Sequence, residues 1–247
     1  MNITVLTYDS LDSTNTEALK QARQGASEGL CIVARQQTAG RGRHGRTWVS
    51  QEDAGLYFSI VLRPKIDTKF LPLITLMTGV AVHDTLQEFG VKPDIKWVND
   101  VLVNEKKISG ILAETTETND GLAVIVGIGI NLKSTNFPPE IADTATSFEK
   151  SMPRTIAARG IIASLTKYLT DFYDILLAEN GPTEIINEWR RRSSYFSGKA
   201  VRVVLENETI TGVTDGLEPN GALRLIEANG ALSIIQAGDV EQLRSEV

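Results

Sequence analysis

Arginine and glycine alternate in the stretch Gly40-Arg41-Gly42-Arg43-His44-Gly45-Arg46-Thr47-Trp48, the most unusual local composition in the chain. Glycines allow close backbone approach, and the three arginines supply planar groups that stay charged at physiological pH. Converging guanidinium and backbone N–H groups bind phosphate or carboxylate, and Trp48 adds a flat apolar face for a ring. A solvated surface loop has the same composition, and because no phosphate-loop fingerprint is present, composition alone leaves both interpretations open.

A second polar group, Lys96-Trp97-Val98-Asn99-Asp100, lies where a short strand meets a turn. Asp100 has the oxygen donors that Mg2+ prefers, and Asn99 is able to bond a base or a sugar. Ordinary turn chemistry is the commoner explanation of an Asn-Asp pair. Lys107 begins an otherwise apolar strand, so its ammonium group either points inward at an anion or protects a strand edge.

Two further motifs suit the walls of a pocket. In Gly127-Ile128-Gly129-Ile130-Asn131, alternate glycines leave one face of a strand bare for a flat group that Asn131 would bond, although a bulge or tight packing explains the pattern equally well. Ser13, Thr14 and Asn15 precede a helix, and Thr14 and Glu17 have the spacing of a capping box. We expect these residues to cap the helix, and their hydroxyls and amides also suit the polar end of a pocket.

The composition is that of an ordinary globular protein of 247 residues with a net charge of −6, which opposes nucleic-acid binding through the overall field. A single cysteine, Cys31, cannot form an internal disulfide and favours a reducing compartment. With only two histidines the chain has too few ligands for a structural zinc site, so we expect any metal to be oxygen-bound. There is no membrane span or secretory signal, and we therefore expect a cytoplasmic protein.

Hydrophobic periodicity predicts an α+β fold with a mixed or antiparallel sheet, because short turns join the strands. A cluster of short strands after residue 196 predicts a small barrel or SH3-like module, so we divide the chain into domains 1–195 and 196–247. The expected strands are 2–8, 30–35, 56–62, 94–97, 101–103, 107–116, 122–132, 201–205, 209–215, 222–227 and 231–236, and the expected helices are 14–24, 71–89, 155–178 and 183–192.

The order and spacing of these motifs resemble the catalytic signature of biotin protein ligases over nearly the whole chain, and Ala237-Gly238-Asp239-Val240 through Arg244 resembles the end of that family's C-terminal domain. His44 and Val98 stand where the family usually has arginine and proline. The resemblance implies a class II synthetase-like catalytic domain followed by an SH3-like β-barrel domain. Because the Ser-Thr-Asn motif begins at residue 13, we expect no DNA-binding helix-turn-helix and no DNA partner.

The resemblance also implies a two-step reaction that uses biotin and ATP, with Mg2+ as cofactor. The biotin carboxylate attacks the α-phosphate of ATP to give biotinyl-5′-AMP and pyrophosphate, and a lysine of a biotin carboxyl carrier protein, a subunit of acetyl-CoA carboxylase, then displaces AMP. An anion must approach a polyanion in the first step, so preorganised cations are required. We further expect the glycine-rich loop to order over biotinyl-AMP. A homodimer is also expected if an exposed sheet edge pairs with that of a second copy.

By the same resemblance Arg43 and Lys107 are the catalytic residues and Asp100 is the metal ligand. The implied biotin site is Ser13, Thr14, Asn15, Gln37, Gly40, Arg41, Arg43, Lys107, Gly110, Gly127 and Gly129, and the implied nucleotide site is Arg41, Arg43, Arg46, Trp48, Asn99, Asn131 and Arg244. Two alternatives are a lipoyl- or octanoyl-type protein acyltransferase of the same fold and a non-catalytic biotin-sensing regulator.

Overall fold

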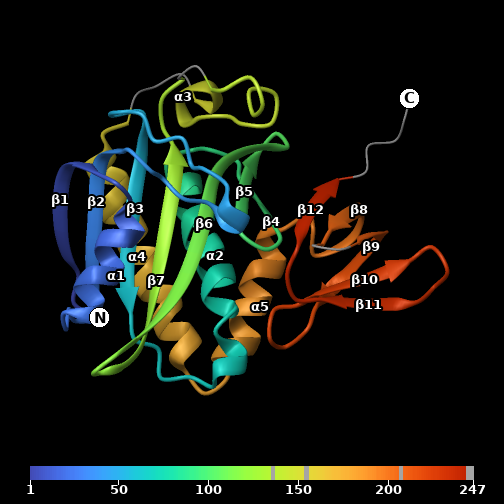
Figure 1. Cartoon of the computed structure of the whole chain (residues 1–247). Coiled ribbons are helices and arrows are strands. Elements are labelled where there is room, and N and C mark those ends of the chain that lie inside the picture. The colour runs from blue at the N-terminus through green and yellow to red at the C-terminus, as the bar shows by residue number, and fades with distance from the viewer. Residues whose placement is uncertain (135–136, 153–155, 206–207, 243–247) are drawn as a thin grey trace.

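A seven-stranded sheet forms the centre of the first part of the chain in the computed structural model, which describes residues 1–134, 137–152, 156–205 and 208–242 (Figure 1). Its order is β1-β2-β3-β7-β6-β5-β4; β1 and β2 run parallel and all other neighbours run antiparallel. The predicted mixed sheet is therefore confirmed. The strands are β1 (Thr4–Leu11), β2 (Leu30–Gln37), β3 (Gly55–Leu62), β4 (Asp94–Lys96), β5 (Asp100–Val103), β6 (Lys106–Thr118) and β7 (Gly121–Asn131).

Helices cover the two faces of this sheet unequally. The main core lies between the sheet and α2 (Leu73–Glu88), α4 (Ala158–Leu177) and α5 (Gly181–Arg192), which lie together behind it in Figure 1. On the opposite face, α1 (Thr14–Arg23) packs Ala18 and Ala22 on a small core, and it is the one α-helix of the described residues assigned to that core. The helix leaves the rest of that face uncovered, and the candidate site lies on this uncovered part. A short helix, α3 (Phe148–Ser151), and two 3-10 turns, η1 (Arg43–Gly45) and η2 (Thr68–Phe70), complete this part.

The structure confirms the short turns predicted between β5 and β6 and between β6 and β7, but it does not confirm the predicted N-terminal cap of α1. Asn104 and Glu105 both have positive φ in the turn between β5 and β6, as a tight hairpin requires, and a turn before Gly121 joins β6 to β7. The predicted capping box is wrong: Ser13 occupies the N-cap position without a side-chain cap bond, and Thr14 is already helical. The Glu17 carboxylate instead accepts a hydrogen bond from Gln21.

A second sheet follows α5, with strands β8 (Ser197–Val204), β9 (Thr209–Leu217), β10 (Leu223–Glu227), β11 (Leu232–Ile235) and β12 (Asp239–Gln242). All its pairings are antiparallel and its order is β11-β10-β9-β8-β12. Within the described residues β11 and β12 do not pair with each other, so the expected barrel is an open sheet here. The boundary between residues 195 and 196 stays a prediction.

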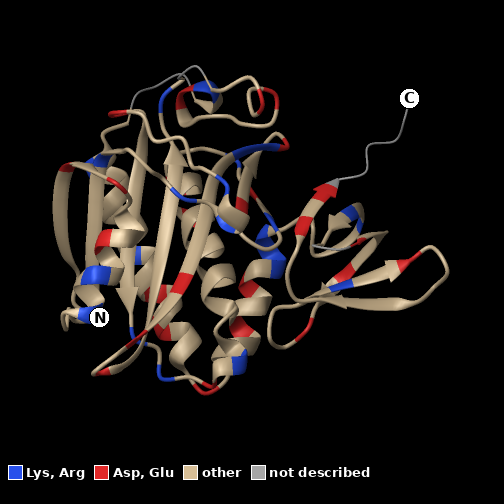
Figure 2. Cartoon of the chain, viewed as in Figure 1, with Lys and Arg blue, Asp and Glu red and all other residues tan. Residues whose placement is uncertain are grey.

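The two parts of the chain contact each other mainly through turns beside the sheets. The Trp97 indole Nε1–H donates to the Gly221 carbonyl at 2.9 Å, and Lys199 pairs with Glu105 at 3.2 Å. In the view of Figure 2, basic and acidic positions are intermingled over helices, turns and some strands, and neither sign gathers on one part of the chain. None of the helices in the described ranges has the length and apolar character needed to cross a membrane.

Candidate active site

A cavity of about 450 Å3 lies on the sheet face that α1 leaves open, between the glycine- and arginine-rich loop, the β5–β6 region and strand β12. It gathers nearly all the residues singled out from the sequence: Ser13, Thr14, Asn15, Gln37, Arg41, Arg43, Arg46, Trp48, Asn99, Asp100, Lys107, Gly110, Gly127, Gly129 and Asn131. Gly40 is buried behind the lining, and Arg244 lies outside the described residues. The basic loop and the Lys107 ammonium group thus face one cavity, as the resemblance implies.

The floor of the cavity is a patch of glycines on neighbouring strands, where Gly129 of β7 pairs with Gly110 of β6 and Gly127 pairs with Ser59 of β3. The space they leave is not empty. A Cβ atom on Gly127 would lie 2.2 Å from Asn15 Oδ1, and one on Gly129 would lie 2.3 Å from Trp48 Cε2. Of the two interpretations left open by the sequence, tight packing therefore applies here, because these glycines make room for the protein's own Asn15 and Trp48, while both still line the cavity.

Neutral side chains form one end of the cavity, at the N-terminus of α1. The Thr14 backbone N–H donates to Gln37 Oε1 at 2.8 Å, and Gln37 Nε2 donates to Ser50 Oγ at 2.8 Å. The Asn15 amide Nδ2 donates to Glu114 Oε2 at 2.7 Å. Thr14 and Asn15 are only 4% and 3% exposed, so this polar end has a fixed geometry.

The glycine- and arginine-rich loop is a small hairpin rather than a solvated coil. Trp48 N–H donates to the Gly40 carbonyl at 2.9 Å, and Gly42 N–H donates to the Arg46 carbonyl at 2.7 Å. A Cβ atom on Gly40 would lie 2.4 Å from the Trp48 carbonyl oxygen, so only glycine fits there. His44, at the tip, has a φ of 53°. The hairpin fixes Trp48 over the glycine floor.

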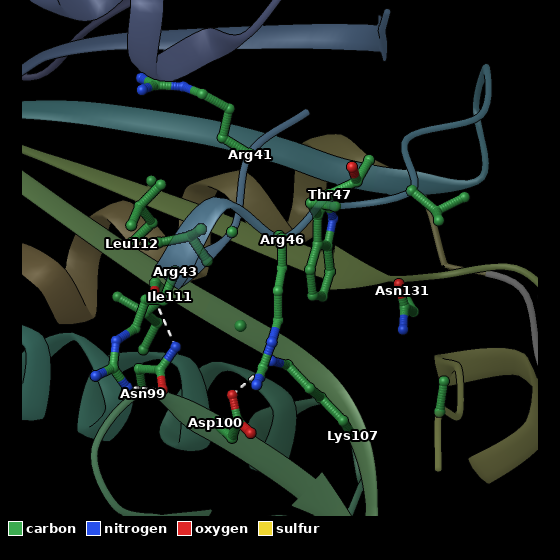
Figure 3. A pocket seen from close by; sticks show the side chains of 18 of the residues that line it. Arg41, Arg43, Arg46, Thr47, Asn99, Asp100, Lys107, Ile111, Leu112 and Asn131 are labelled. Carbon is green, nitrogen blue, oxygen red and sulfur yellow. Dashed lines mark hydrogen bonds and ion pairs between the residues drawn. The ribbon is translucent and has the colours of Figure 1, made fainter. Parts of the chain in front are cut away.

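The three arginines of this loop have different environments. Arg41 forms a two-pronged pair with Glu114, at 2.9 and 2.8 Å, and points away from Asp100 and Lys107 (Figure 3). Arg43 Nη1 donates to Asn99 Oδ1 at 3.0 Å, and burial lowers the pKa of this guanidinium despite the nearby carboxylates. Arg46 pairs with Asp239 Oδ2 of the second sheet at 2.5 Å.

Lys107 and Asp100 form the centre of the cationic end. Lys107 Nζ lies 2.6 Å from Asp100 Oδ1 and 5.5 Å from the centre of the Trp48 ring, while Lys96 Nζ lies 3.2 Å from Asp100 Oδ2. Burial raises the pKa of Asp100, but the two ammonium groups more than offset this, so its pKa is lowered and it stays ionised. The Lys107 backbone is held by the carbonyl of Thr144 and the N–H of Thr146.

Positive charge exceeds negative charge in this cluster. At the cationic end Arg43, Arg46, Lys96 and Lys107 share two carboxylates, those of Asp100 and Asp239. Arg41 is paired with Glu114, which lies beside Asn15. The other two acidic residues of the lining, Glu105 and Glu241, pair with Lys199 and Arg202. The excess charge suits a ligand that brings phosphate or carboxylate groups into the cavity.

The residues present do not form a resident metal site. In the part of the chain that the structure describes, no three His, Cys, Asp or Glu side chains are grouped to hold a metal ion. Both oxygens of Asp100 already contact ammonium groups. Because protein-bound Mg2+ usually shares one or two carboxylates with substrate phosphates, this donor set does not fit a magnesium ion held by the chain alone. Asp100 as a metal ligand stays a prediction.

Comparisons with known proteins agree with this geometry. Residues 7–131 match the biotin/lipoate A/B protein ligase family, and residues 196–242 match the biotin protein ligase C-terminal domain. The biotin–[acetyl-CoA-carboxylase] ligase of Mycobacterium tuberculosis is 33% identical, over 94% of this chain and 86% of that protein. The chain belongs to the biotin protein ligase family.

Two more comparisons place this biotin protein ligase family member among solved and curated relatives. The biotin protein ligase from Aquifex aeolicus, solved in complex with biotin and ATP, has a TM-score of 0.83 and 31% identity, covering 98% of this chain and 99% of that one. The bifunctional ligase/repressor BirA of Bacillus subtilis (strain 168) is 37% identical, over 88% of this chain and 68% of that protein. These relatives are ligases, so the enzyme class predicted from the sequence is confirmed.

Three residues of this ligase's cavity region received no role from the sequence. Ser59 is one of two polar residues in the run 56–62, and no spacing rule connects it to the Ser-Thr-Asn motif. Glu114 lies in the expected strand 107–116, but its pairing with Arg41 depends on how β6 lies beside the loop. Asp239 belongs to the C-terminal motif, and only the docking of the second sheet brings it to Arg46.

Proposed function

We propose that this ligase activates biotin with ATP as biotinyl-5′-AMP and transfers the biotinyl group to one lysine of a biotin carboxyl carrier protein. The observation that supports this most directly is that one cavity has both a neutral, hydrogen-bonding end and a cationic end, with the glycines of β6 and β7 between them. The first end suits a buried ureido ring, whose N–H and C=O groups need partners. The second suits the junction of a carboxylate with a phosphate chain.

In the first step a carboxylate oxygen of biotin forms a bond to the α-phosphorus, and the bond from that phosphorus to the bridging oxygen of pyrophosphate breaks. Repulsion between the two anions is the main obstacle. Lys107 and Arg43 reduce it, because both cations face the cavity and Arg43 is partnered by the neutral Asn99 at its closest contact. Trp48 covers the reacting groups and limits the access of water.

In the second step the ε-amine of the acceptor lysine attacks the carbonyl carbon of the mixed anhydride. The new amide bond releases AMP, and the amine gives up a proton. The acceptor is inferred from the relatives named biotin–[acetyl-CoA-carboxylase] ligase. We propose that Mg2+ enters with the phosphates of ATP, that the reaction takes place in the cytoplasm, and that no DNA is bound; the homodimer stays a prediction.

The decisive experiment is incubation of the protein with ATP, Mg2+, biotin and a biotinyl-domain acceptor, followed by mass measurement of the acceptor. We expect the acceptor to gain one biotinyl group, and an acceptor with its target lysine changed to arginine to gain none. An unmodified acceptor, with no biotin-dependent pyrophosphate release, would contradict the proposal.

The lipoyl or octanoyl alternative is tested in the same assay, because the matching family description covers lipoate as well as biotin ligases. Replacing biotin by lipoate or octanoate should leave the acceptor unmodified. The match of residues 196–242 to the biotin protein ligase C-terminal domain favours biotin. An electrophoretic shift with promoter DNA would instead favour the regulator.

A further inference from the structure

Ser59 lies beneath the neutral end of the cavity without belonging to its lining. It is fully buried in β3, between the core residues Phe58 and Ile60. Its Oγ lies 2.6 Å from Asn15 Oδ1 and 2.8 Å from Thr14 Oγ1. A hydroxyl in an apolar strand costs stability unless it is bonded, so its two partners account for its place there.

The hydrogen positions follow from the partners of Asn15. Its amide nitrogen donates both hydrogens, one to Glu114 Oε2 at 2.7 Å and one to the Leu112 carbonyl at 3.2 Å. The amide oxygen is therefore the atom that faces Ser59, and it can only accept. Ser59 has one hydroxyl hydrogen and gives it to Asn15.

This assignment decides what Thr14 offers to the cavity. With the Ser59 hydrogen given to Asn15, the 2.8 Å contact between the two hydroxyls is a hydrogen bond only when Thr14 donates to Ser59. The other protein acceptor near Thr14 Oγ1 is Gln37 Oε1, at 3.1 Å, which also accepts the Thr14 backbone N–H at 2.8 Å. In both arrangements the one hydroxyl hydrogen of Thr14 is used within the protein, so this oxygen can only accept a hydrogen bond from a ligand.

We infer that Ser59 is a positioning residue for the biotin ring: it fixes Thr14 and Asn15 so that the neutral end accepts a hydrogen bond from a ureido N–H. This rests on the proposed function. The register of the sheet supports it, because Ser59 pairs with Gly127, and the missing side chain of that glycine makes room for the Asn15 amide. Ser59, Gly127 and Asn15 thus form one unit.

The test is steady-state kinetics of biotin-dependent pyrophosphate release by the Ser59→Ala variant. We expect the KM for biotin to rise about 10- to 100-fold, as when a buried acceptor loses its donor, with the KM for ATP and kcat within about twofold of wild type. A variant that merely weakened the fold would not raise the KM for biotin while leaving the KM for ATP unchanged. Ser59→Cys, of similar size but a poor donor, should show the same separation if Ser59→Ala folds poorly.

Ser109→Ala is the matched control. Ser109 is also fully buried in a central strand, β6, but among the described residues its Oγ has no hydrogen-bond partner. Its removal should leave both KM values unchanged.

A double-mutant cycle adds a second criterion. In a Thr14→Ala background, Ser59→Ala should raise the KM for biotin much less than it does in wild type, because the residue through which it acts is gone. An unchanged KM for biotin in active Ser59→Ala, or independent effects in the cycle, would overturn the inference. Absence of biotin-dependent pyrophosphate release in wild type would contradict the proposed function itself.

Discussion

The two ends of the cavity differ in how their side chains are held. At the neutral end, Thr14 and Asn15 are nearly inaccessible and are fixed by hydrogen bonds to other neutral groups and to Glu114. At the cationic end, the Lys107 and Asp100 side chains keep 34% and 15% of their exposure and are held by ion pairs. One end has a fixed geometry, and the other has charges that can exchange partners.

This difference suits the two tasks of the ligase. A ring is recognised by donors and acceptors in fixed positions, because a buried polar group left unpaired is costly. Phosphate groups that arrive and leave need cations whose carboxylate partners can be replaced. Partly exposed ion pairs contribute little stability, so exchanging Asp239, whose partner Arg46 is 67% exposed, for a phosphate costs little.

The largest expected effect comes from removing the ammonium group at the centre of the cationic end. Lys107→Met should lower kcat for biotin-dependent pyrophosphate release by about 100- to 1000-fold, as when a transition-state stabilising group is lost. The KM for biotin should change much less. Lys106→Met is the control, since Lys106 is exposed, lies outside the lining and should have no role. Comparable losses in both variants would show that the position of the charge is unimportant.

The two arginines of one motif should differ in the same assay. Arg43→Ala should lower kcat/KM for ATP by about 10- to 100-fold, because it removes a partly buried cation that lines the cavity. Arg41→Ala should change it by less than about threefold, because its guanidinium is held by Glu114 at a partly exposed position. Equal losses would show that Arg41 leaves Glu114 when substrates bind.

The contact between the loop and the second sheet should have a smaller effect. Asp239→Asn removes the ion pair with Arg46, so trypsin should cleave the loop after Arg43 and Arg46 about two- to fivefold faster in the ligand-free protein. Asp215→Asn removes a comparable pair with Arg224 within the second sheet and is the control. Cleavage that is unchanged in Asp239→Asn would mean that the ion pair does not hold the loop.

The smallest effect concerns stability and pH at the cationic end. The folded-state pKa of Asp100 is lowered below its value of about 3.9 in the unfolded chain, so its stabilising contribution is present above about pH 4 and is lost as the pH falls through the folded-state value. The difference in unfolding free energy between wild type and Asp100→Asn, from urea denaturation, should therefore shrink between pH 6 and pH 3. For Asp120→Asn, in an exposed turn, the difference should stay constant.

Local patterns in the sequence determined the order of most strands and helices, although they did not predict β12 or the short helix α3. They also determined the tight turns at Asn104-Glu105 and before Gly121, and the motifs that surround the cavity. These features depend on neighbouring residues: turn chemistry, strand alternation and glycine placement act over a few positions. The same short range explains the wrong capping box, because Thr14 has the right spacing to Glu17 but its hydroxyl is bonded in the tertiary structure.

Only the tertiary structure decided which side chains meet. Arg41 and Arg43 are two residues apart, yet one reaches Glu114 and the other Asn99, because a hairpin turns them to different sides. The partners of Asn15 and Arg46 lie 99 and 193 residues away. Such contacts depend on strand register and on the docking of one sheet beside another, which no local pattern encodes.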